Sequence, residues 1–354
     1  GCRVTARGTD WSLALLVALL VATGLLTAFA GSPDSAWIFA LHGALGFGVA
    51  VVLVWKGRRV WRRVADPARW DGRTGFGLLA AALVLGALAS GFLWSGGADV
   101  RVGGFGLLNW HWALGAALGL LVLVHALLRA KRPRARDITG RRQLLATASV
   151  TVGAVAFWQL QRPVSALFGL RGARRRFTGS YEAASFAGNA FPSTSWVADH
   201  PRELPAGHRV TVGGLCARPG ALTVERLDAG DELVATLDCT GGFYSTQRWR
   251  GVRLGRVLDA AGPTPAAAHV RVVSHTGYRW SFPLAVARGL LLATHVGGEP
   301  LSHDHGAPVR LVAPGRRGFQ WVKWVERIEL HADPDPGAPA ATVWSSFTAK
   351  GRGA

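Results

Sequence analysis

Two patterns of apolar residues divide the chain. In the first half, four unbroken apolar runs are long enough, at about 1.5 Å per residue, to cross a ~30 Å hydrocarbon layer as helices. These runs are residues 11–30, 36–55, 75–94 and 107–128. Tryptophans stand near their ends, as in the aromatic belts of membrane helices, at positions 11, 55, 94 and 110. The pattern predicts an all-α transmembrane bundle of four helices.

The loops between these runs predict how the bundle is oriented. Residues 56–73 and residues 129–142 each carry seven Lys or Arg, whereas residues 31–35 carry none and residues 95–106 carry only Arg101. The positive-inside rule places both basic loops, and the N-terminus, in the cytoplasm. These loops account for much of the net charge of +19. The charge therefore does not predict nucleic-acid binding, for which a basic helix interleaved with aromatic residues would be expected.

A fifth, weaker apolar span covers residues 144–160. The preceding residues 139–145, TGRRQLL, resemble a twin-arginine export signal that is placed inside the chain. The alternative is that Arg141 and Arg142 merely end the basic loop, and the sequence leaves both interpretations open. Five crossings from a cytoplasmic N-terminus would place residues 161–354 on the extracytoplasmic side of a bacterial cytoplasmic membrane.

Three histidines lie inside the predicted spans, where an unpaired ionisable ring is costly. His42 and His111 lie at similar depths near the outer ends of the second and fourth spans, so two facing imidazoles could ligate one b-type haem axially. His125 follows His111 by fourteen residues, a spacing that resembles the di-haem bundles of the cytochrome b type. Lys56, however, stands fourteen residues after His42, where a second inner imidazole would be needed. One outer haem is expected; the alternatives are two haems, or none, with the rings hydrogen-bonded between helices.

Short alternating segments replace the apolar runs after residue 208. Strands separated by Gly and Pro are expected at residues 209–212, 221–224, 233–237 and 270–273. A short helix is expected at about residues 254–260. Because strands and helices follow no strict repeat, an α+β domain fits better than a doubly wound sheet.

One strand of this domain delivers Cys239 to a glycine-rich turn. A thiolate beside flexible backbone suits an open site for a thiophilic metal. Taken alone, the cysteine is more easily explained as a buried structural residue, because free Cys is among the most buried residue types. Further motifs change this interpretation. They are Trp-x-Gly-Val-x-Leu at 249–254, Pro-Leu-x-x-x-His-Gly-x-Pro-x-Arg at 300–310, Pro-Gly-Arg-x-Gly at 314–318 and Val-Lys-Trp at 322–324.

In this order the motifs resemble the molybdopterin-binding domain of the sulfite oxidase superfamily, over roughly residues 176–332. That superfamily also contains the catalytic subunit of methionine sulfoxide reductase and the plant nitrate reductases. The resemblance implies a molybdopterin cofactor carrying molybdenum, with Cys239 as the metal ligand. It also implies that three residues lie along the pterin, namely His305, Arg310 and Lys323.

The phosphate of such a cofactor needs fixed donors, which Arg side chains and backbone N–H groups of a glycine-rich turn provide. Candidates for this cofactor-binding set fall within fourteen residues: Arg310, Arg316, Arg317, Gly318 and Lys323. The alternative for the arginines is a solvated basic loop. Candidates to face the substrate, some of them catalytic, are Tyr244, Gln247, His275, Tyr278 and Arg279. The arginine-rich anion site of sulfite oxidases is not legible around Cys239, which brings the chain nearer to the sulfoxide reductases.

The predicted organisation has four parts: a bundle at 1–135, a twin-arginine-like segment with a fifth helix and linker at 136–175, a molybdopterin-binding catalytic domain at 176–335, and a tail at 336–354. We expect a membrane-bound oxidoreductase that performs oxygen-atom transfer, or related two-electron chemistry, on a small sulfoxide, N-oxide or sulfite. The bundle would exchange electrons with quinone or a redox protein. The alternatives are a non-catalytic, membrane-anchored pterin-binding or assembly protein, and an enzyme whose bundle is only an anchor.

Overall fold

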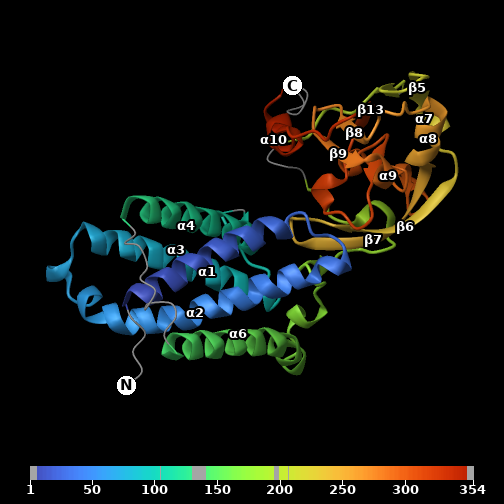
Figure 1. Cartoon of the computed structure of the whole chain (residues 1–354). Coiled ribbons are helices and arrows are strands. Elements are labelled where there is room, and N and C mark those ends of the chain that lie inside the picture. Colours follow the sequence, from blue (N-terminus) through green and yellow to red (C-terminus); the bar gives the residue numbers. More distant parts are fainter. Residues whose placement is uncertain (1–5, 104, 130–140, 195–198, 206, 349–354) are drawn as a thin grey trace. The chain divides into compact units, whose positions relative to one another are not determined.

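A computed structural model describes residues 6–103, 105–129, 141–194, 199–205 and 207–348. The chain forms two compact units, residues 1–179 and residues 180–354 (Figure 1). The predicted loop at 130–140, with the start of the twin-arginine-like segment, lies outside the described residues.

The first unit is helical. Its long helices are α1 (Ala6–Thr27), α2 (Ala36–Val64), α3 (Gly72–Ser95), α4 (Leu107–Arg129) and α6 (Arg141–Leu167). Its short elements are η1 (Pro33–Ser35), η2 (Pro67–Arg69), η3 (Arg171–Arg174) and a ribbon of β1 (Arg101–Val102) and β2 (Phe105–Gly106). The prediction of a helix over each of the five apolar spans is confirmed.

Within the described residues, four helical stretches are long and apolar enough to cross a membrane, judged by length and composition: Arg7–Thr27, Pro33–Val64, Thr74–Ser95 and Leu107–Leu127. A small core holds them together, with one residue from each helix: Val17, Val49, Val84 and Leu118. Outside this core, large apolar side chains face outward; Leu15 is 61% exposed and Leu120 is 64% exposed. A helix surface that is apolar on the outside as well as the inside is typical of a bundle in lipid.

The second unit combines two sheets with short helices, so the predicted α+β class is confirmed. One sheet has the order β11–β10–β7–β3, with β12 also paired to β10 and β6 also paired to β7. Its pairings are antiparallel except that of β3 with β7. The strands are β3 (Tyr181–Glu182), β6 (Asp231–Asp238), β7 (Phe243–Arg253), β10 (Leu291–Val296), β11 (Glu299–Pro300) and β12 (Arg310–Val312).

The other sheet has the order β5–β4–β13–β8–β9, in which β13 is parallel to β4 and antiparallel to β8. Its strands are β4 (Arg209–Gly214), β5 (Gly220–Thr223), β8 (His269–Ser274), β9 (Arg279–Pro283) and β13 (Val325–His331). The helices are α7 (Val224–Leu227), α8 (Leu254–Ala261), α9 (Leu284–Ala287) and α10 (Ala338–Trp344), with turns η4 (Gly188–Ala190), η5 (His303–His305), η6 (Gly318–Gln320) and η7 (Ser345–Phe347). The predicted strands and the helix after the cysteine are confirmed.

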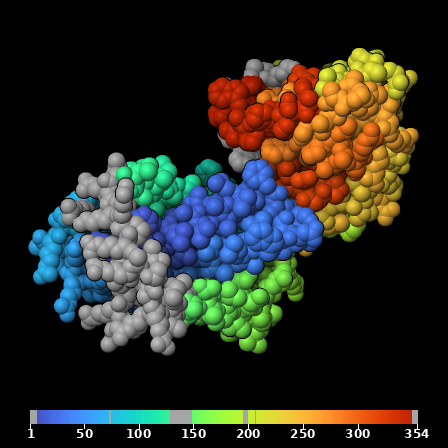
Figure 2. Space-filling model, viewed as in Figure 1, coloured from blue at the N-terminus to red at the C-terminus, as the bar shows by residue number. Residues whose placement is uncertain are grey.

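One hydrophobic core joins both sheets, with Val210 from β4, Ile328 from β13 and Leu292 from β10 all fully buried. Along β4, exposed and buried residues alternate because successive side chains of a strand point to opposite faces. The space-filling view shows one outer face of this unit, coloured from yellow-green to red (Figure 2). The core thus provides a rigid base for the turn between β6 and β7.

Candidate active site around Cys239

The turn between β6 and β7 presents Cys239. The Cys239 amide donates to the Phe243 carbonyl at 2.8 Å, and the Gly242 amide donates to the Cys239 carbonyl at 3.0 Å. Gly242 has φ +100°, a left-handed conformation that favours glycine. The Cys239 sulfur is 3.3 Å from the Gly241 amide nitrogen and 3.1 Å from the Thr194 hydroxyl oxygen. The tight turn therefore fixes a largely buried thiol, 8% exposed, at the end of a strand.

A buried ion pair between Arg317 and Asp238 supports this turn. The Arg317 guanidinium donates to the Asp238 carboxylate at 2.6 Å and to the Cys239 carbonyl at 3.3 Å. The Ser180 hydroxyl donates to the same carboxylate at 2.8 Å. A side chain at Gly318 would place its Cβ 3.0 Å from the Cys239 Cα, so a glycine allows this close approach. Arg317 and Gly318, which the sequence suggested as phosphate donors, thus hold the cysteine turn in place.

Arg310 has different surroundings. Its side chain, 1% exposed, lies between the rings of Trp249 and Trp321, with the guanidinium carbon 5.1 Å and 5.7 Å from the ring centroids. It donates to the His305 carbonyl at 3.0 Å, and its Nε is buried without a hydrogen-bond partner. Among the described residues, no carboxylate forms an ion pair with it. Burial lowers the Arg310 pKa to about 9, while the nearby Cys239 raises it.

Lys323 adds a second cation near the thiol. Its ammonium donates to three neutral oxygens: the Ser193 hydroxyl at 2.9 Å, the Thr194 carbonyl at 3.2 Å and the Asp304 carbonyl at 2.6 Å. Burial and the charge of Arg310 lower the Lys323 pKa to about 8, and Cys239 acts in the opposite direction. Two cations and one thiol therefore share a partly closed site in which a bound anion would be stabilised.

His305 is held by the protein through both ring nitrogens. Its Nε2 is 2.9 Å from the Phe191 carbonyl and its Nδ1 is 2.7 Å from the Ser302 hydroxyl. Because a carbonyl only accepts, Nε2 carries a hydrogen. Burial and the Arg310 charge lower the His305 pKa to about 4. His305 thus fixes the chain at Phe191 on the rim of the site.

The residues predicted to face the substrate have different surroundings in the structure. Tyr278 stays near the thiol: its hydroxyl donates to the Phe319 carbonyl, and burial raises its pKa, with Asp199 and Cys239 adding to the shift. His275 instead pairs with Glu326, its Nδ1 3.1 Å from the carboxylate.

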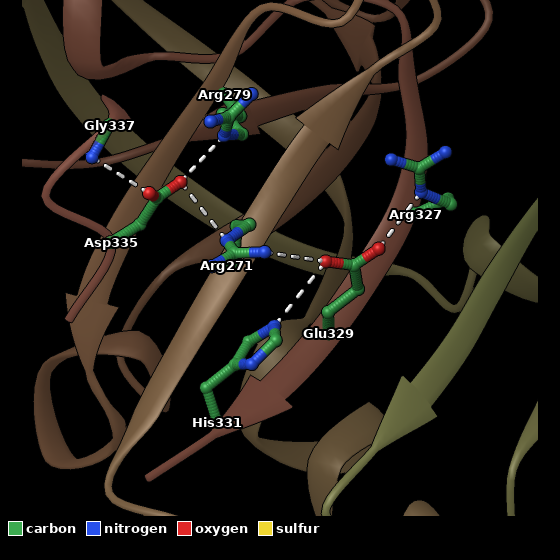
Figure 3. A network of polar contacts seen from close by, with 7 residues as sticks. All are labelled: Arg271, Arg279, Arg327, Glu329, His331, Asp335 and Gly337. Atoms are coloured by element: carbon green, nitrogen blue, oxygen red, sulfur yellow. Dashed lines mark hydrogen bonds and ion pairs between the residues drawn. The ribbon is translucent and has the colours of Figure 1, made fainter. Parts of the chain in front are cut away.

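Arg279 lies in a polar network on β8, β9 and β13 (Figure 3). Its Nε donates to Asp335 at 2.6 Å, and Arg271 lies 3.1 Å from the same carboxylate. Arg271 also reaches Glu329 at 3.3 Å, which links the network to Arg327. The network therefore gives Arg279 a carboxylate partner.

The remaining candidates lie on β7 and in the loop before η6. Tyr244 lies on β7, opposite Asp238 in the strand register, and is partly buried. Gln247, fully buried on the same strand, donates to the Ala184 carbonyl at 2.7 Å and contributes to packing. Arg316 is partly buried, and its carbonyl accepts from the Trp321 indole at 3.2 Å.

Sequence reasoning missed three polar residues of the site. Ser193 and Thr194 reach Lys323 and Cys239 from a segment that reads only as a polar lead-in. Asp199, 3% exposed, accepts from the Thr276 and Ser345 hydroxyls at 3.3 Å each, and burial raises its pKa. None of the three belongs to a recognisable motif; only the neighbouring Pro192 hinted at a fixed backbone there.

A second pair of candidate ligands lies in the first unit. The rings of His42 and His111 have centroids 5.9 Å apart and planes at 82°. The Nδ1 of His111 is 2.8 Å from the Ala87 carbonyl, so it must carry the hydrogen. The Nδ1 of His42 is 2.9 Å from the Thr23 hydroxyl, which already donates to the Leu19 carbonyl at 2.7 Å and therefore accepts from the ring. In the neutral form of both rings, Nε2 is therefore the unprotonated nitrogen that can ligate a metal.

The other predicted level of the bundle is occupied differently. The Lys56 ammonium donates to the Asp10 carboxylate at 2.9 Å, and Arg59 lies 3.7 Å from the same group. His125 stacks on Phe76, with ring centroids 4.8 Å apart. An ion pair therefore stands where a second pair of imidazoles would be required, which agrees with the departure from the di-haem pattern.

Residues 197–338 match the family model of the oxidoreductase molybdopterin binding domain. The matched stretch lies in the second unit, which therefore resembles a molybdopterin-binding oxidoreductase domain. The chain is 36% identical over 155 residues to NAD(P)H nitrate reductase from Hordeum vulgare. The aligned stretch covers 34% of this chain and 17% of that protein. It is 33% identical to the protein-methionine-sulfoxide reductase catalytic subunit MsrP from Xanthomonas axonopodis pv. citri, covering 34% and 44%.

Mitochondrial sulfite oxidase from Macaca fascicularis is 38% identical over 112 residues, 28% of this chain and 21% of that protein. A solved structure, the sulfane dehydrogenase SoxCD from Paracoccus pantotrophus, aligns with a TM-score of 0.36 and 28% identity over 37% of this chain and 40% of that chain. The chain thus spans less than half the length of these relatives. These curated relatives are molybdopterin oxidoreductases of the sulfite oxidase type.

The residues around Cys239 fit a molybdopterin cofactor. Such a group is anionic at its phosphate and binds a thiophilic metal, and the site offers a thiol together with a buried cation that lacks a carboxylate. An isolated charge in a protein interior is costly, so Arg310 is best explained by an anion that binds beside it. Cys239 could ligate the metal, and Arg310 and Lys323 could balance the charge of the group.

Proposed function

We propose that this protein is a membrane-bound, molybdenum-dependent oxidoreductase that performs oxygen-atom transfer or a related two-electron reaction on a small molecule. One observation carries the proposal: the Arg310 guanidinium is buried, with no carboxylate partner among the described residues, near Cys239 and inside a domain whose relatives are molybdopterin oxidoreductases. When bound, the molybdenum cofactor supplies the two-electron couple for the reaction.

The protein's own residues have distinct tasks in this proposal. Cys239 ligates the metal, and Arg310 with Lys323 fixes the anionic cofactor through charge. Arg317, through Asp238, keeps the turn rigid so that the sulfur stays in position. Tyr278, held on the Phe319 carbonyl, lines the site on the substrate side. The proposed substrate is a small sulfoxide, N-oxide or sulfite. The names of the relatives refer to nitrate, sulfoxide and sulfite.

We further propose that His42 and His111 ligate one b-type haem between α2 and α4. The hydrogen bonds at both Nδ1 atoms support this, since metal-ligating histidines commonly donate that hydrogen to a carbonyl or another oxygen acceptor. The haem would carry single electrons between the catalytic site and quinone or a redox protein. The ion pair of Lys56 with Asp10 argues against a second haem.

The proposed location follows from the loops. The basic loops at 56–73 and 129–142 favour the cytoplasmic side. If α6 adds a fifth crossing to the four stretches that are long and apolar enough to span a membrane, residues 161–354 would lie on the extracytoplasmic side. A domain that acquires its cofactor in the cytoplasm would cross the membrane already folded, the situation that twin-arginine transport serves. The twin-arginine-like segment at 139–145 is the proposed signal.

The decisive experiment is to purify the intact protein in detergent and to measure metals together with a reduced-minus-oxidised optical spectrum. We expect about one molybdenum per chain and a b-type haem band. Cys239→Ala should lose molybdenum and keep the haem, whereas His42→Ala and His111→Ala should lose the haem and keep molybdenum. Molybdenum without haem would make the bundle an anchor. Neither group, in protein from a cofactor-competent host, would contradict the enzyme proposal and favour a non-catalytic assembly role.

A further inference from the structure

Among the described residues, two groups lie within hydrogen-bonding distance of the Cys239 sulfur. The Gly241 amide nitrogen lies 3.3 Å from the sulfur, and the Thr194 hydroxyl oxygen lies 3.1 Å from it. The first contact comes from the same turn, two residues away. The second comes from a segment 45 residues earlier in the chain. The Thr194 contact is therefore built by the tertiary fold and not by local backbone geometry.

The protein fixes Thr194 independently of the sulfur. The Thr194 carbonyl accepts from the Lys323 ammonium at 3.2 Å. The preceding Ser193 hydroxyl accepts from the same ammonium at 2.9 Å and donates to the Asp304 carbonyl at 2.7 Å. Earlier in the segment, the Phe191 carbonyl accepts from His305 at 2.9 Å. The motif-bearing stretch at 303–323 thus holds residues 191–194 at three points and positions the Thr194 hydroxyl over the sulfur.

We propose that Thr194 is a positioning residue for the metal centre: its hydroxyl donates a hydrogen bond to the Cys239 sulfur ligand and raises the reduction potential of the molybdenum. This inference rests on the proposed function, in which Cys239 ligates that metal.

The direction of the effect follows from the chemistry of the ligand. A thiolate bound to a metal has no hydrogen, so its sulfur can only accept, and the threonine hydroxyl must be the donor. A hydrogen bond draws electron density from the sulfur and weakens its donation to the metal. The reduced metal is then favoured over the oxidised one, which raises the potential; hydrogen bonds to metal-bound sulfur and partners outside the ligand sphere act in this way at other centres.

The test compares three variants of the intact protein with the wild type. Thr194→Val removes the hydroxyl at nearly constant shape, and Thr194→Ser keeps the hydroxyl but removes the methyl group. Thr236→Val is the matched control: it makes the same change on β6, the strand that leads to Cys239, where the hydroxyl pairs with Thr246 at 2.9 Å. Molybdenum content is measured first, and the potential is then determined by a redox titration followed through the EPR signal of the metal.

We expect the potential to fall in Thr194→Val and to stay at the wild-type value in Thr194→Ser and Thr236→Val. The EPR titration reads only molecules that carry the metal, so partial loading of a variant does not affect the comparison. An unchanged potential in Thr194→Val, or an equal fall in Thr194→Ser, would overturn the inference while leaving the proposed function intact. Wild-type protein without molybdenum would overturn the proposed function itself, and the inference with it.

Discussion

Two buried arginines of the second unit, seven residues apart, occupy opposite kinds of surroundings. Arg317 is 4% exposed and donates to the Asp238 carboxylate at 2.6 Å. Arg310 is 1% exposed, and its charge lies near a carbonyl, two indole rings, the Cys239 thiol and the Lys323 cation. Arg317 has a carboxylate as its partner within the protein, so it supports the scaffold. Arg310 has no carboxylate partner among the described residues, so we expect it to face a bound anion.

The burial of the two arginine charges differs in its energetic cost. A buried charge without a partner costs several kcal/mol, and removing one partner of a buried pair costs about 3–5 kcal/mol. The fold can tolerate the first cost where a bound group offsets it, because binding to the folded state stabilises that state. The same Arg→Met substitution should therefore lower the stability of the fold at position 317 and the cofactor content at position 310.

The largest effect is expected at the scaffold position. Arg317→Met leaves the Asp238 carboxylate buried without its cation, so the free energy of unfolding should fall by about 3–5 kcal/mol. Tryptophan fluorescence during urea unfolding of the detergent-solubilised protein measures this. In the double variant Asp238→Leu/Arg317→Met no charge is left behind, and much of the loss should be recovered. A double variant no more stable than Arg317→Met would show that the ion pair is not what supports the turn.

At the binding position the same substitution should act on the cofactor. Arg310→Met keeps an unbranched side chain between Trp249 and Trp321 but removes the charge that faces the bound anion. A charge-assisted hydrogen bond contributes about 1.5–3 kcal/mol, so molybdenum and pterin content should fall by about tenfold or more. The cofactor-free protein should unfold no more easily than the wild type. Full cofactor content in Arg310→Met would remove the distinction between the two arginines.

The sequence predicted the elements well and the partnerships poorly. The helices and the strands of the second unit follow from local periodicity, which the chain carries residue by residue. The motif order pointed to Cys239 and to the arginines, and the family model matches the stretch that carries these motifs. It could not separate Arg310 from Arg317, because the carboxylate that engages Arg317 is 79 residues away.

The same limit explains why two contacts of the second unit could not be predicted from the sequence. Thr194 contacts Cys239 across 45 residues, and Arg279 meets Asp335 across 56 residues. Neither contact leaves a periodic or spacing signal in the sequence. The bundle shows the reverse case: the spacing of His42, Lys56 and His111 indicated which level lacks a second imidazole, because a helix fixes relative height from residue number alone.

The charge of Arg310 can also be detected through its neighbour. Burial and Arg310 hold the His305 pKa at about 4, below the value of 6.5 expected in the unfolded chain. Between these values the unfolded state binds more protons, so stability is lost as the pH falls from about 6.5 towards 4. Between pH 7 and pH 5 this should cost about 2 kcal/mol, and the loss should be absent in His305→Gln.

The measurement is the free energy of unfolding of both proteins at pH 7 and pH 5. In Arg310→Met the repulsive cation is gone, so the pKa of His305 should rise and the acid loss should shrink. Arg317→Met, which leaves Arg310 in place, is the matched control and should keep the wild-type pH dependence. Parallel pH curves for wild type and His305→Gln would contradict a neutral, buried His305.

The smallest effect is expected at Arg279, which resembles Arg317 in having a carboxylate but lies nearer the surface. Burial pulls the pKa of Asp335 upward, and the hydrogen bonds from Arg279 and the Gly337 amide outweigh it, so that the pKa lies below its usual value. Because Arg271 still faces Asp335 when Arg279 is removed, Arg279→Met should cost only about 1 kcal/mol. Its KM for a small sulfoxide or for sulfite, whichever the wild type turns over, should be unchanged. A raised KM at unchanged stability would indicate that Arg279 belongs to the substrate site. It would also show that an arginine of this domain with a carboxylate partner does not always belong to the scaffold.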